Sequence, residues 1–184
     1  MKKFLIALLT ALLALSLCAC GGNDKKGAGD DVINEARTLV DEAGGICGRI
    51  YSNAGLSADI TEENENDKYM PVDSDVLTSI QKIKDATLLY FTQEVAETIL
   101  FPSAFEGDEP MYIEENGVLM VNTEKMLEAW RTQWDFDSAV VTQQTDTSAT
   151  MRMKVIVSDV EAGQKSLTIE KGADGHWRLA CSIA

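Results

Sequence analysis

The sequence has little of what most enzymes use for catalysis. Its 184 residues include a single histidine, His176. No string in the chain is typical of a nucleophilic serine, a zinc-bound water or a phosphate-binding loop. It also lacks a CxxC pair and any cluster of cysteine with histidine, which excludes structural zinc and thioredoxin chemistry. We therefore expect a protein that is not an enzyme, with no catalytic residues, no cofactor and no metal site.

Positive charge is scarce as well. The chain has 16 lysine and arginine residues against 30 aspartate and glutamate residues, for a formal net charge of −14 at pH 7. Binding of nucleic acid requires a basic surface, so we expect none. Attraction to an anionic membrane surface by charge is excluded for the same reason. If the charge has a use, the partner is basic or locally positive. The alternative is that the charge only keeps the protein soluble.

The one long apolar run lies at the N-terminus and is too short to cross a membrane. It extends from residue 4 to residue 17 behind two lysines, whereas a spanning helix needs ~20 residues. A basic start and a short apolar core are typical of a secretory signal. Signal cleavage requires a small residue before the cut. Ala19 before Cys20 meets this requirement, and bulky Leu17 before Cys18 does not.

The string LCACGG, residues 17–22, resembles the lipobox of bacterial lipoproteins, whose cysteine carries a diacylglycerol and becomes the mature N-terminus. The resemblance implies a signal peptide over residues 1–19, a lipid anchor on Cys20 and a location on the outer face of the cytoplasmic membrane. Residues 20–30 have the composition of a flexible linker that reaches ~17 to 19 Å. Residues 31–184 then form a single domain close to the membrane.

The first half of the domain has the apolar spacing of helices. We expect a first amphipathic helix to begin after Asp30 or Asp31 and to stop at Gly44-Gly45, with a ragged continuation over GICGRIYSN, residues 45–53, as the alternative. Residues 58–69 are rich in carboxylates but do not have the register of a calcium loop. We interpret them as a solvated loop.

Two further helices are expected before residue 105. The second begins after cap residues 73–74 and extends to about Leu88. Thr92 is expected to cap a third, short helix that ends just before Pro102, with Ile99 among its inward-facing residues.

The second half of the domain has the signals of strands. Apolar runs flank Asn116-Gly117, a pair typical of a two-residue hairpin turn. Residues 123–130 are a possible helix, and residues 138–144 a strand. Three more strands alternate clearly, with these inward positions: Met151, Met153, Val155, Val157, Leu167, Ile169, Trp177, Leu179, Cys181 and Ile183. The pattern predicts an α+β domain whose N-terminal helices pack on one face of a curved antiparallel sheet of about four to six strands.

Two cysteines remain apart from the lipobox, Cys47 and Cys181. An oxidising exterior permits a disulfide between them, which would stabilise the fold by ~4 to 5 kcal/mol through loop closure. Two independent buried thiols are the alternative, and the sequence leaves both open.

Several strings also resemble a known family. The runs LLYFTQEVAETIL, YIEENGVLMV, WDFDSAVVTQQTDTSATMRMKVIV and SLTIEKGADGHWRLA are similar to the bacterial DL-endopeptidase inhibitor family over roughly residues 75–183. The resemblance implies a cystatin-like α+β fold. It also implies that the protein blocks cell-wall endopeptidases of the NlpC/P60 type, which cut between D-glutamate and diaminopimelate, and so restrains autolysis. Lipoproteins of the NTF2-like type share such patterns.

Acidic loops are the candidate partner-binding residues under this interpretation, since a positively lined substrate groove would attract them. The candidates are Glu106, Asp108 and Glu109, with Glu114 and Glu115 at the hairpin. The alternative is that these side chains only solvate a loop and a sheet edge.

A second hypothesis is a cystatin-like or NTF2-like cup that binds a small ligand or a peptide in an apolar pocket. A pocket that contains Trp130 or Trp134 would favour it, and a filled core with a protruding acidic loop would favour the inhibitor. For Trp177, on an alternating strand, packing in the core is the expected role.

Overall fold

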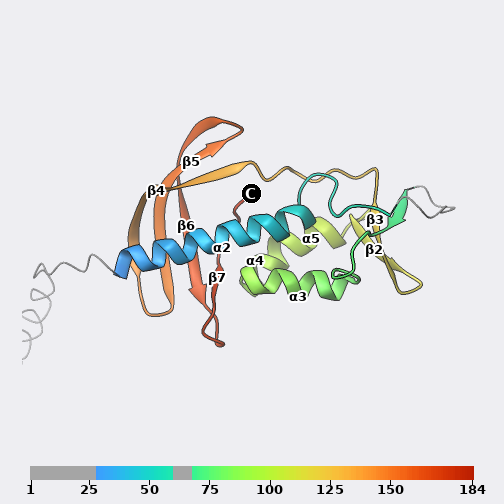
Figure 1. The fold of residues 1–184 in the computed structure, drawn as a ribbon, viewed down its shortest axis with the longest axis horizontal. Helices are drawn as coiled ribbons and strands as arrows, with labels where there is room; N and C mark the ends of the chain where they lie inside the picture. The colour runs from blue at the N-terminus through green and yellow to red at the C-terminus, as the bar shows by residue number, and fades with distance from the viewer. Residues whose placement is uncertain (1–27, 60–67) are drawn as a thin grey trace, which may run out of the picture. The chain divides into compact units, whose positions relative to one another are not determined.

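Helices and two antiparallel sheets make up the domain, which a computed structural model describes for residues 28–59 and 68–184 (Figure 1). The predicted α+β class is confirmed. Residues 31–184 form one compact unit. The predicted signal peptide, Cys20, most of the linker and most of the acidic segment 58–69 lie outside the described residues. In chain order the elements are α2 (Ala28–Ile50), β1 (Tyr69–Pro71), α3 (Ile80–Tyr90), α4 (Gln93–Val95), the π-helix η1 (Ala96–Leu100), α5 (Phe101–Phe105), β2 (Tyr112–Glu115), β3 (Val118–Asn122), β4 (Thr132–Gln144), β5 (Ser148–Val157), β6 (Val160–Lys171) and β7 (Trp177–Leu179).

The helix α2 has 23 residues and passes through Gly44-Gly45, so the predicted stop at this pair is wrong. Each glycine lowers helix stability by ~1 kcal/mol relative to alanine. Ala43 and Cys47, on either side of the pair, have no exposed surface. Such packing stabilises a helix more than intrinsic propensity does, and it carries α2 past the glycines. The buried face consists of Val32, Ala36, Leu39, Val40, Ala43, Cys47 and Ile50.

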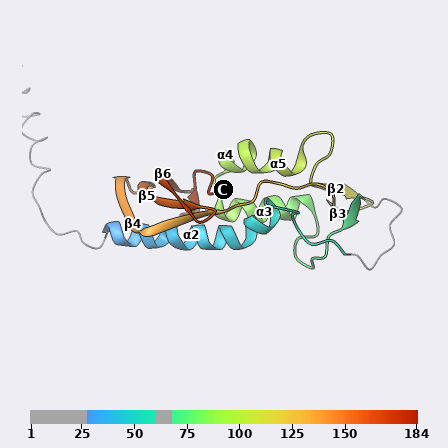
Figure 2. The same ribbon diagram turned by 90° about the horizontal axis from the view of Figure 1, so that it is seen from above.

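The larger sheet is an antiparallel meander in the order β4-β5-β6-β7. The helix α2 lies across one of its faces (Figures 1 and 2). The predicted alternation along β5 is confirmed, because Met151 and Met153 are fully buried while Arg152 and Lys154 are exposed. The buried side chains of the sheet and the apolar face of α2 together form the core of the domain.

The hairpin around Asn116-Gly117 forms as predicted, between β2 and β3. Asn116 (φ 52°) and Gly117 (φ 81°) both have the positive φ that this type of two-residue turn requires. The hairpin nevertheless belongs to a second sheet, in the order β1-β3-β2. The predicted antiparallel sheet of about four to six strands corresponds to the four-stranded sheet, and the second sheet was not anticipated. The domain has a four-stranded and a three-stranded sheet, which residues 123–131 connect.

This connecting segment forms no helix, although one was predicted as possible at residues 123–130. Two of its backbone donors bond instead to the residues that follow α2, and others bond to Lys68 and Asn122. The N–H of Leu127 donates to the carbonyl of Asn53 at 2.7 Å, and the N–H of Trp130 donates to Ser52 Oγ at 3.0 Å. Bonds between distant segments thus satisfy donors that a helix would have satisfied locally.

The helix α3 begins later than predicted. Its N-cap is Ser79, whose hydroxyl accepts a hydrogen bond from Lys82 N at 3.1 Å. The expected cap, Ser74, accepts hydrogen bonds from Val76 N and Leu77 N at 3.3 and 3.0 Å. These bonds form a local turn at Ser74 rather than a helix start.

Thr92 caps the next helix as predicted, and its hydroxyl accepts from Val95 N at 3.4 Å. The chain then widens into η1 and continues as α5, so Pro102 lies in the first turn of α5 rather than past the end of a helix. A π-turn adds one residue to the helix and shifts the phase of its faces. As a result Ile99, predicted to face inward, is 45% exposed.

Cys47 and Cys181 are free thiols in the structure, which corresponds to the second of the two alternatives that the sequence left open. Cys181 lies just past β7, where its sulfur accepts a hydrogen bond from Thr168 N at 3.5 Å. Cys47 has no exposed surface and is hydrogen-bonded to the side chain of Thr87. Burial raises the pKa of the Cys47 thiol to about 12.

We expect the fold to lose stability in alkali partly through Cys47. The pKa of this thiol in the unfolded chain is near its ordinary value of 9.0 and is higher in the folded state. The unfolded chain therefore loses the proton first, and the stabilisation present below pH 9 is lost as the pH rises toward 12. At pH 10 the loss is about 1 kcal/mol. Urea unfolding at pH 8 and pH 10 measures it. Cys47→Ala should lack this part of the decrease, and an equal decrease in both proteins would refute the assignment.

Candidate functional site

The first candidate site is the acidic loop, residues 106–109, which joins α5 to β2. Glu106 is the C-cap of α5, and its N–H donates to the carbonyl of Pro102 at 3.3 Å. Gly107 follows with φ +95°, a conformation that glycine adopts without strain, and turns the chain away from the helix. Glu106, Asp108 and Glu109 are all exposed.

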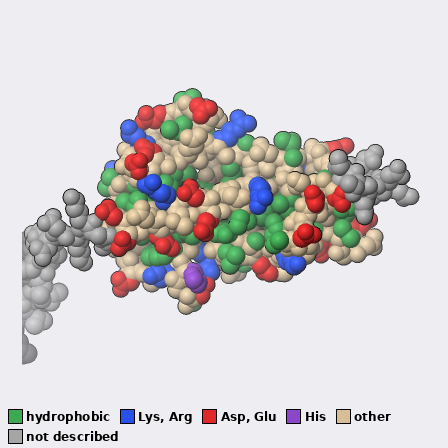
Figure 3. All heavy atoms as spheres, viewed as in Figure 1, with side chains coloured by type: hydrophobic (Ala, Val, Ile, Leu, Met, Phe, Trp, Pro, Cys, Tyr) green, Lys and Arg blue, Asp and Glu red, His purple; other side chains and the backbone are tan. Residues whose placement is uncertain are grey.

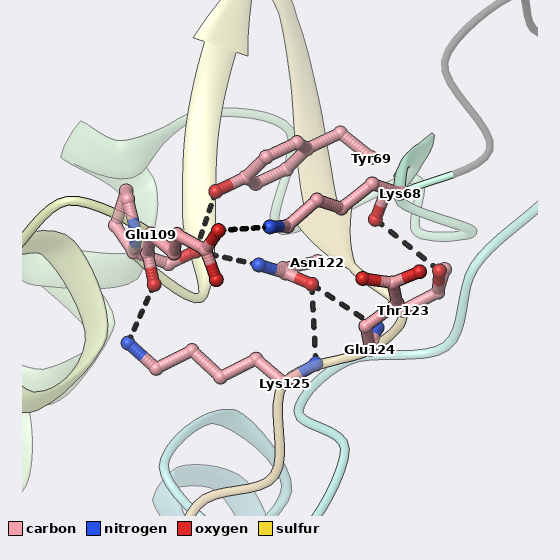
Figure 4. A network of polar contacts seen from close by, with 8 residues as sticks. Lys68, Tyr69, Glu109, Asn122, Thr123, Glu124 and Lys125 are labelled. Atoms are coloured by element: carbon pink, nitrogen blue, oxygen red, sulfur yellow. Dashed lines mark hydrogen bonds and ion pairs between the residues drawn. The ribbon is translucent and has the colours of Figure 1, made fainter.

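A network of polar contacts fixes the base of the acidic loop (Figure 4). The carboxylate of Glu109 forms an ion pair with Lys68, beside β1. The ammonium of Lys125 donates to the carbonyl oxygen of Glu109 at 2.8 Å, and Tyr69 donates to the carbonyl of the adjacent Pro110 at 3.0 Å. Two separate segments, residues 68–69 and the region of Lys125, therefore hold this end of the loop.

The buried side chain of Asn122 connects this network to the end of β3. Its carbonyl oxygen accepts from the N–H groups of Glu124 and Lys125 at 3.0 and 3.1 Å. This arrangement positions Lys125 for its bond to the loop (Figure 4). The contact with Lys68 also holds the pKa of the Glu109 carboxyl below its ordinary value. Glu109 is thus committed to the fold rather than available to a partner.

Glu106 and Asp108 have a different environment. Within residues 28–59 and 68–184, neither carboxylate takes part in an ion pair or a side-chain hydrogen bond. Both side chains are exposed on a loop whose far end is fixed through Glu109. They are the two carboxylates of the loop that have no partner among the described residues.

The two candidates at the hairpin, Glu114 and Glu115, also differ in their contacts. Glu114 Oε1 accepts a hydrogen bond from Ile80 N, the first residue of α3, at 2.7 Å. A carboxylate at a helix N-terminus stabilises that end of the helix, so Glu114 has a structural role. Glu115 is exposed beside the turn. All five predicted residues are exposed, but Glu109 and Glu114 have partners within the fold, whereas Glu106, Asp108 and Glu115 have none among the described residues.

The second candidate site is a groove of about 520 Å³ between α2 and the first residues of β4. Asp41, Gly44 and Gly48 recur at helical spacing along the side of α2 that lines the groove. From β4, Trp134 and Phe136 line the opposite side. These two residues are separated by one position, which places both on the sheet face that packs toward α2.

The glycines keep this groove open. A Cβ atom added at Gly44 would meet nothing within 4 Å, and one added at Gly48 would lie 3.8 Å from Trp130 Cε3. Neither position is packed so tightly that only glycine would fit there. The groove was not predicted from the sequence, because Gly44-Gly45 was interpreted as a helix stop. One sequence feature could have indicated the groove: glycine recurs at positions 44 and 48, each next to a buried position of the helix.

Trp130 and Trp134 are held in place by the surrounding protein. The ring of Trp130 stacks on Tyr51 with 6.5 Å between centroids, and it meets Phe91 edge-on at 6.2 Å. Trp134 Nε1 donates to the carbonyl of Ile183 at 3.5 Å. Both tryptophans are half-buried and line the groove, as the ligand-binding hypothesis expected for at least one of them. Trp177 is also half-buried, with the Lys171 ammonium 4.7 Å from its ring centroid.

No protein-family model matches the chain, and no curated protein is significantly similar to it. In the described part of the chain, no helix has both the length and the apolar character needed to cross a bilayer. The same residues contain no group of three or more histidine, cysteine, aspartate or glutamate side chains that could hold a metal ion.

Proposed function

We propose that this protein is a membrane-anchored extracytoplasmic lipoprotein that binds and inhibits peptidoglycan DL-endopeptidases of the NlpC/P60 type and so restrains autolysis. The observation that carries the proposal is the acidic loop, residues 106–109. Glu109 is fixed at the base of this loop by Lys68, while Glu106 and Asp108 face solvent without a partner among the described residues. The resemblance to the inhibitor family supplies the class of partner.

A loop fixed in this way suits protein recognition. A loop that is already ordered loses less conformational entropy on binding than a disordered one. Unpaired carboxylates that point outward are attracted to a positively lined groove, and such charges mainly increase the association rate and set the register of the complex. Acidic side chains are also spread over the face that carries α2, which adds to long-range attraction (Figure 3).

Association kinetics test this proposal. The full-length protein is incorporated into neutral vesicles, and the catalytic domain of an NlpC/P60 endopeptidase from the same organism is passed over them. We expect specific binding whose association rate falls as salt is raised, because salt screens charges beyond ~8 Å at physiological ionic strength. Absence of binding at both low and physiological salt would refute the proposed partner.

The predicted anchor gives a separate expectation. Cys20→Ala removes the sulfur that would carry the lipid, and removal of residues 1–19 leaves 14 basic and 30 acidic residues, which provide no electrostatic attachment to an anionic membrane. We expect labelled fatty acid on the wild type and none on the variant, with the variant lost from the membrane fraction. A variant that remained fully membrane-bound would contradict the lipid anchor.

The alternative of a ligand-binding cup is supported by the groove, because the groove contains both Trp130 and Trp134. The lining is not purely apolar, since it also includes Asp41 and Arg49. A site of this composition binds a ligand through both stacking and hydrogen bonds. Such binding and endopeptidase inhibition are compatible functions of one domain, since the groove and the acidic loop share no residues.

A further inference from the structure

We infer that the groove between α2 and β4 is a binding site for a neutral oligosaccharide chain. This inference goes beyond endopeptidase inhibition and does not rest on it. It depends on four properties of the groove: its length, its fixed aromatic rings, its balance of charge, and the blocked edge of β4.

The groove continues into two neighbouring hollows, so an extended ligand fits it better than a compact one. A hollow of about 410 Å³ shares Trp130, Thr132 and Gln133 with the groove and reaches the turn between β5 and β6. A third hollow, of about 380 Å³, shares Arg131 and Thr132 with the second. The three hollows are thus neighbours around the first residues of β4.

The aromatic rings and glycines suit flat rings with hydroxyl groups. Trp130 and Trp134 are fixed by Tyr51, Phe91 and the carbonyl of Ile183, so they need little ordering when a ligand binds. The face of an indole packs well against the C–H face of a pyranose ring, which is apolar and nearly planar. Gly44, opposite them on α2, carries no side chain that would fill the space for such a ring.

Charge in this region is balanced, unlike the rest of the chain. The groove contains Asp41 and Arg49, and the second hollow contains Arg131 and Asp159, whereas the chain as a whole carries −14. A polyanion or a polycation would gain no net attraction from such a lining. The planar groups of Arg49 and Gln133 instead offer several donors and acceptors, which can bond adjacent hydroxyl or acetamido groups of a neutral sugar.

An extended peptide is the main competing ligand, and β4 is poorly suited to it. Peptides commonly bind at a free sheet edge by adding a strand. β4 is an edge strand, but its pairing with β5 shifts register between Asp135 and Val140. At this bulge Arg37 packs over the ring of Phe136 at 5.5 Å and bonds Asp137 at 2.8 Å. A bulge covered in this way interrupts the backbone groups that an added strand would need.

Tryptophan fluorescence tests the inference, because two of the three tryptophans line the groove. The full-length protein, in a detergent without a sugar headgroup, is titrated with chitotetraose, with cellotetraose and with a neutral tetrapeptide, in the absence of any endopeptidase. We expect a saturable change in emission with a tetrasaccharide and none with the peptide. A change in emission with chitotetraose alone would indicate that the groove recognises the acetamido groups. A change with both sugars would indicate that ring stacking dominates.

Two adjacent glycines provide matched variants. Gly44 and Gly45 are both exposed in α2 with nothing within 4 Å of an added Cβ, but only Gly44 lines the groove. Gly44→Leu should weaken tetrasaccharide binding by roughly tenfold or more, whereas Gly45→Leu should leave it unchanged. Both variants should keep the circular dichroism of the wild type, since leucine favours helix more than glycine does. Absence of a saturable change with either sugar, equal binding by the two variants, or binding of the peptide alone would overturn the inference. None of these outcomes depends on whether an endopeptidase is inhibited.

Discussion

Reversal of two charges, in the variant Glu106→Lys/Asp108→Lys, should weaken endopeptidase inhibition by roughly 10- to 100-fold at low salt. Both carboxylates are exposed, and neither has an ion-pair partner among the residues that the structure describes. Their replacement should therefore cost the fold little while it converts an attractive loop into a repulsive one. The concentration for half-inhibition of peptidoglycan digestion, determined at low and at high salt, measures the effect.

A matched control separates local charge from total charge. Glu35→Lys/Glu42→Lys makes the same change in net charge on exposed residues of α2. It should reduce inhibition only slightly, and the two double variants should become more alike as salt is raised. Equal loss of inhibition in both variants would show that the acidic loop has no special role.

Among substitutions that remove a single heavy atom, we expect Tyr112→Phe to lower the free energy of unfolding most. This residue is 1% exposed, and its hydroxyl donates to the carbonyl of Ile50 and accepts from Leu56 N, both at 2.8 Å. Tyr112→Phe removes both bonds and leaves two backbone groups without partners in a region where water has little access. An unsatisfied buried polar group costs about 1 to 3 kcal/mol, so the free energy of unfolding should fall by at least that amount.

The surroundings of Tyr112 leave no room for compensation. Gly55 has φ +72°, and a Cβ added there would lie 2.5 Å from the Tyr112 hydroxyl. The chain after α2 is thus folded closely around this oxygen.

Urea unfolding of Tyr112→Phe measures the loss. Tyr90→Phe is the control, because the Tyr90 hydroxyl makes no recorded hydrogen bond within the described ranges and its removal should be nearly neutral. Equal stability of the two variants would contradict the assigned bonds.

Features that depend on local chemistry were predictable from the sequence. The pair Asn116-Gly117 forms its turn because both residues tolerate positive φ. Thr92 caps its helix because its own hydroxyl reaches a donor three residues away. The alternation in β5 follows from the period of two that one buried face imposes. In each case the determining contacts lie within a few residues or on one strand.

Features that depend on distant partners were not predictable. Residues 123–130 have apolar positions consistent with a helix, but their donors bond to Ser52 and Asn53, more than seventy residues earlier. These residues also link the two sheets, because they lie between β3 and β4. Gly44-Gly45 resembles a helix stop, and only the packing of the residues around the pair shows that the helix continues.

The sequence likewise predicted only part of the candidate site. Composition indicated an acidic loop and placed Glu106, Asp108 and Glu109 on it. It could not separate accessible carboxylates from structural ones, because Glu109 is bound by Lys68, and Glu114 by the N-terminus of α3, both from other parts of the chain. The groove depends on glycines of α2 that face β4, a juxtaposition that only the fold creates.

The central claim is that this protein inhibits a peptidoglycan DL-endopeptidase through its acidic loop. The most direct measurement is the turbidity of purified peptidoglycan during digestion by an NlpC/P60 endopeptidase from the same organism, with increasing amounts of the full-length protein at two salt concentrations. We expect dose-dependent inhibition that weakens as salt is raised. Digestion that proceeds at an unchanged rate with saturating protein, for every such enzyme of the organism, would contradict it.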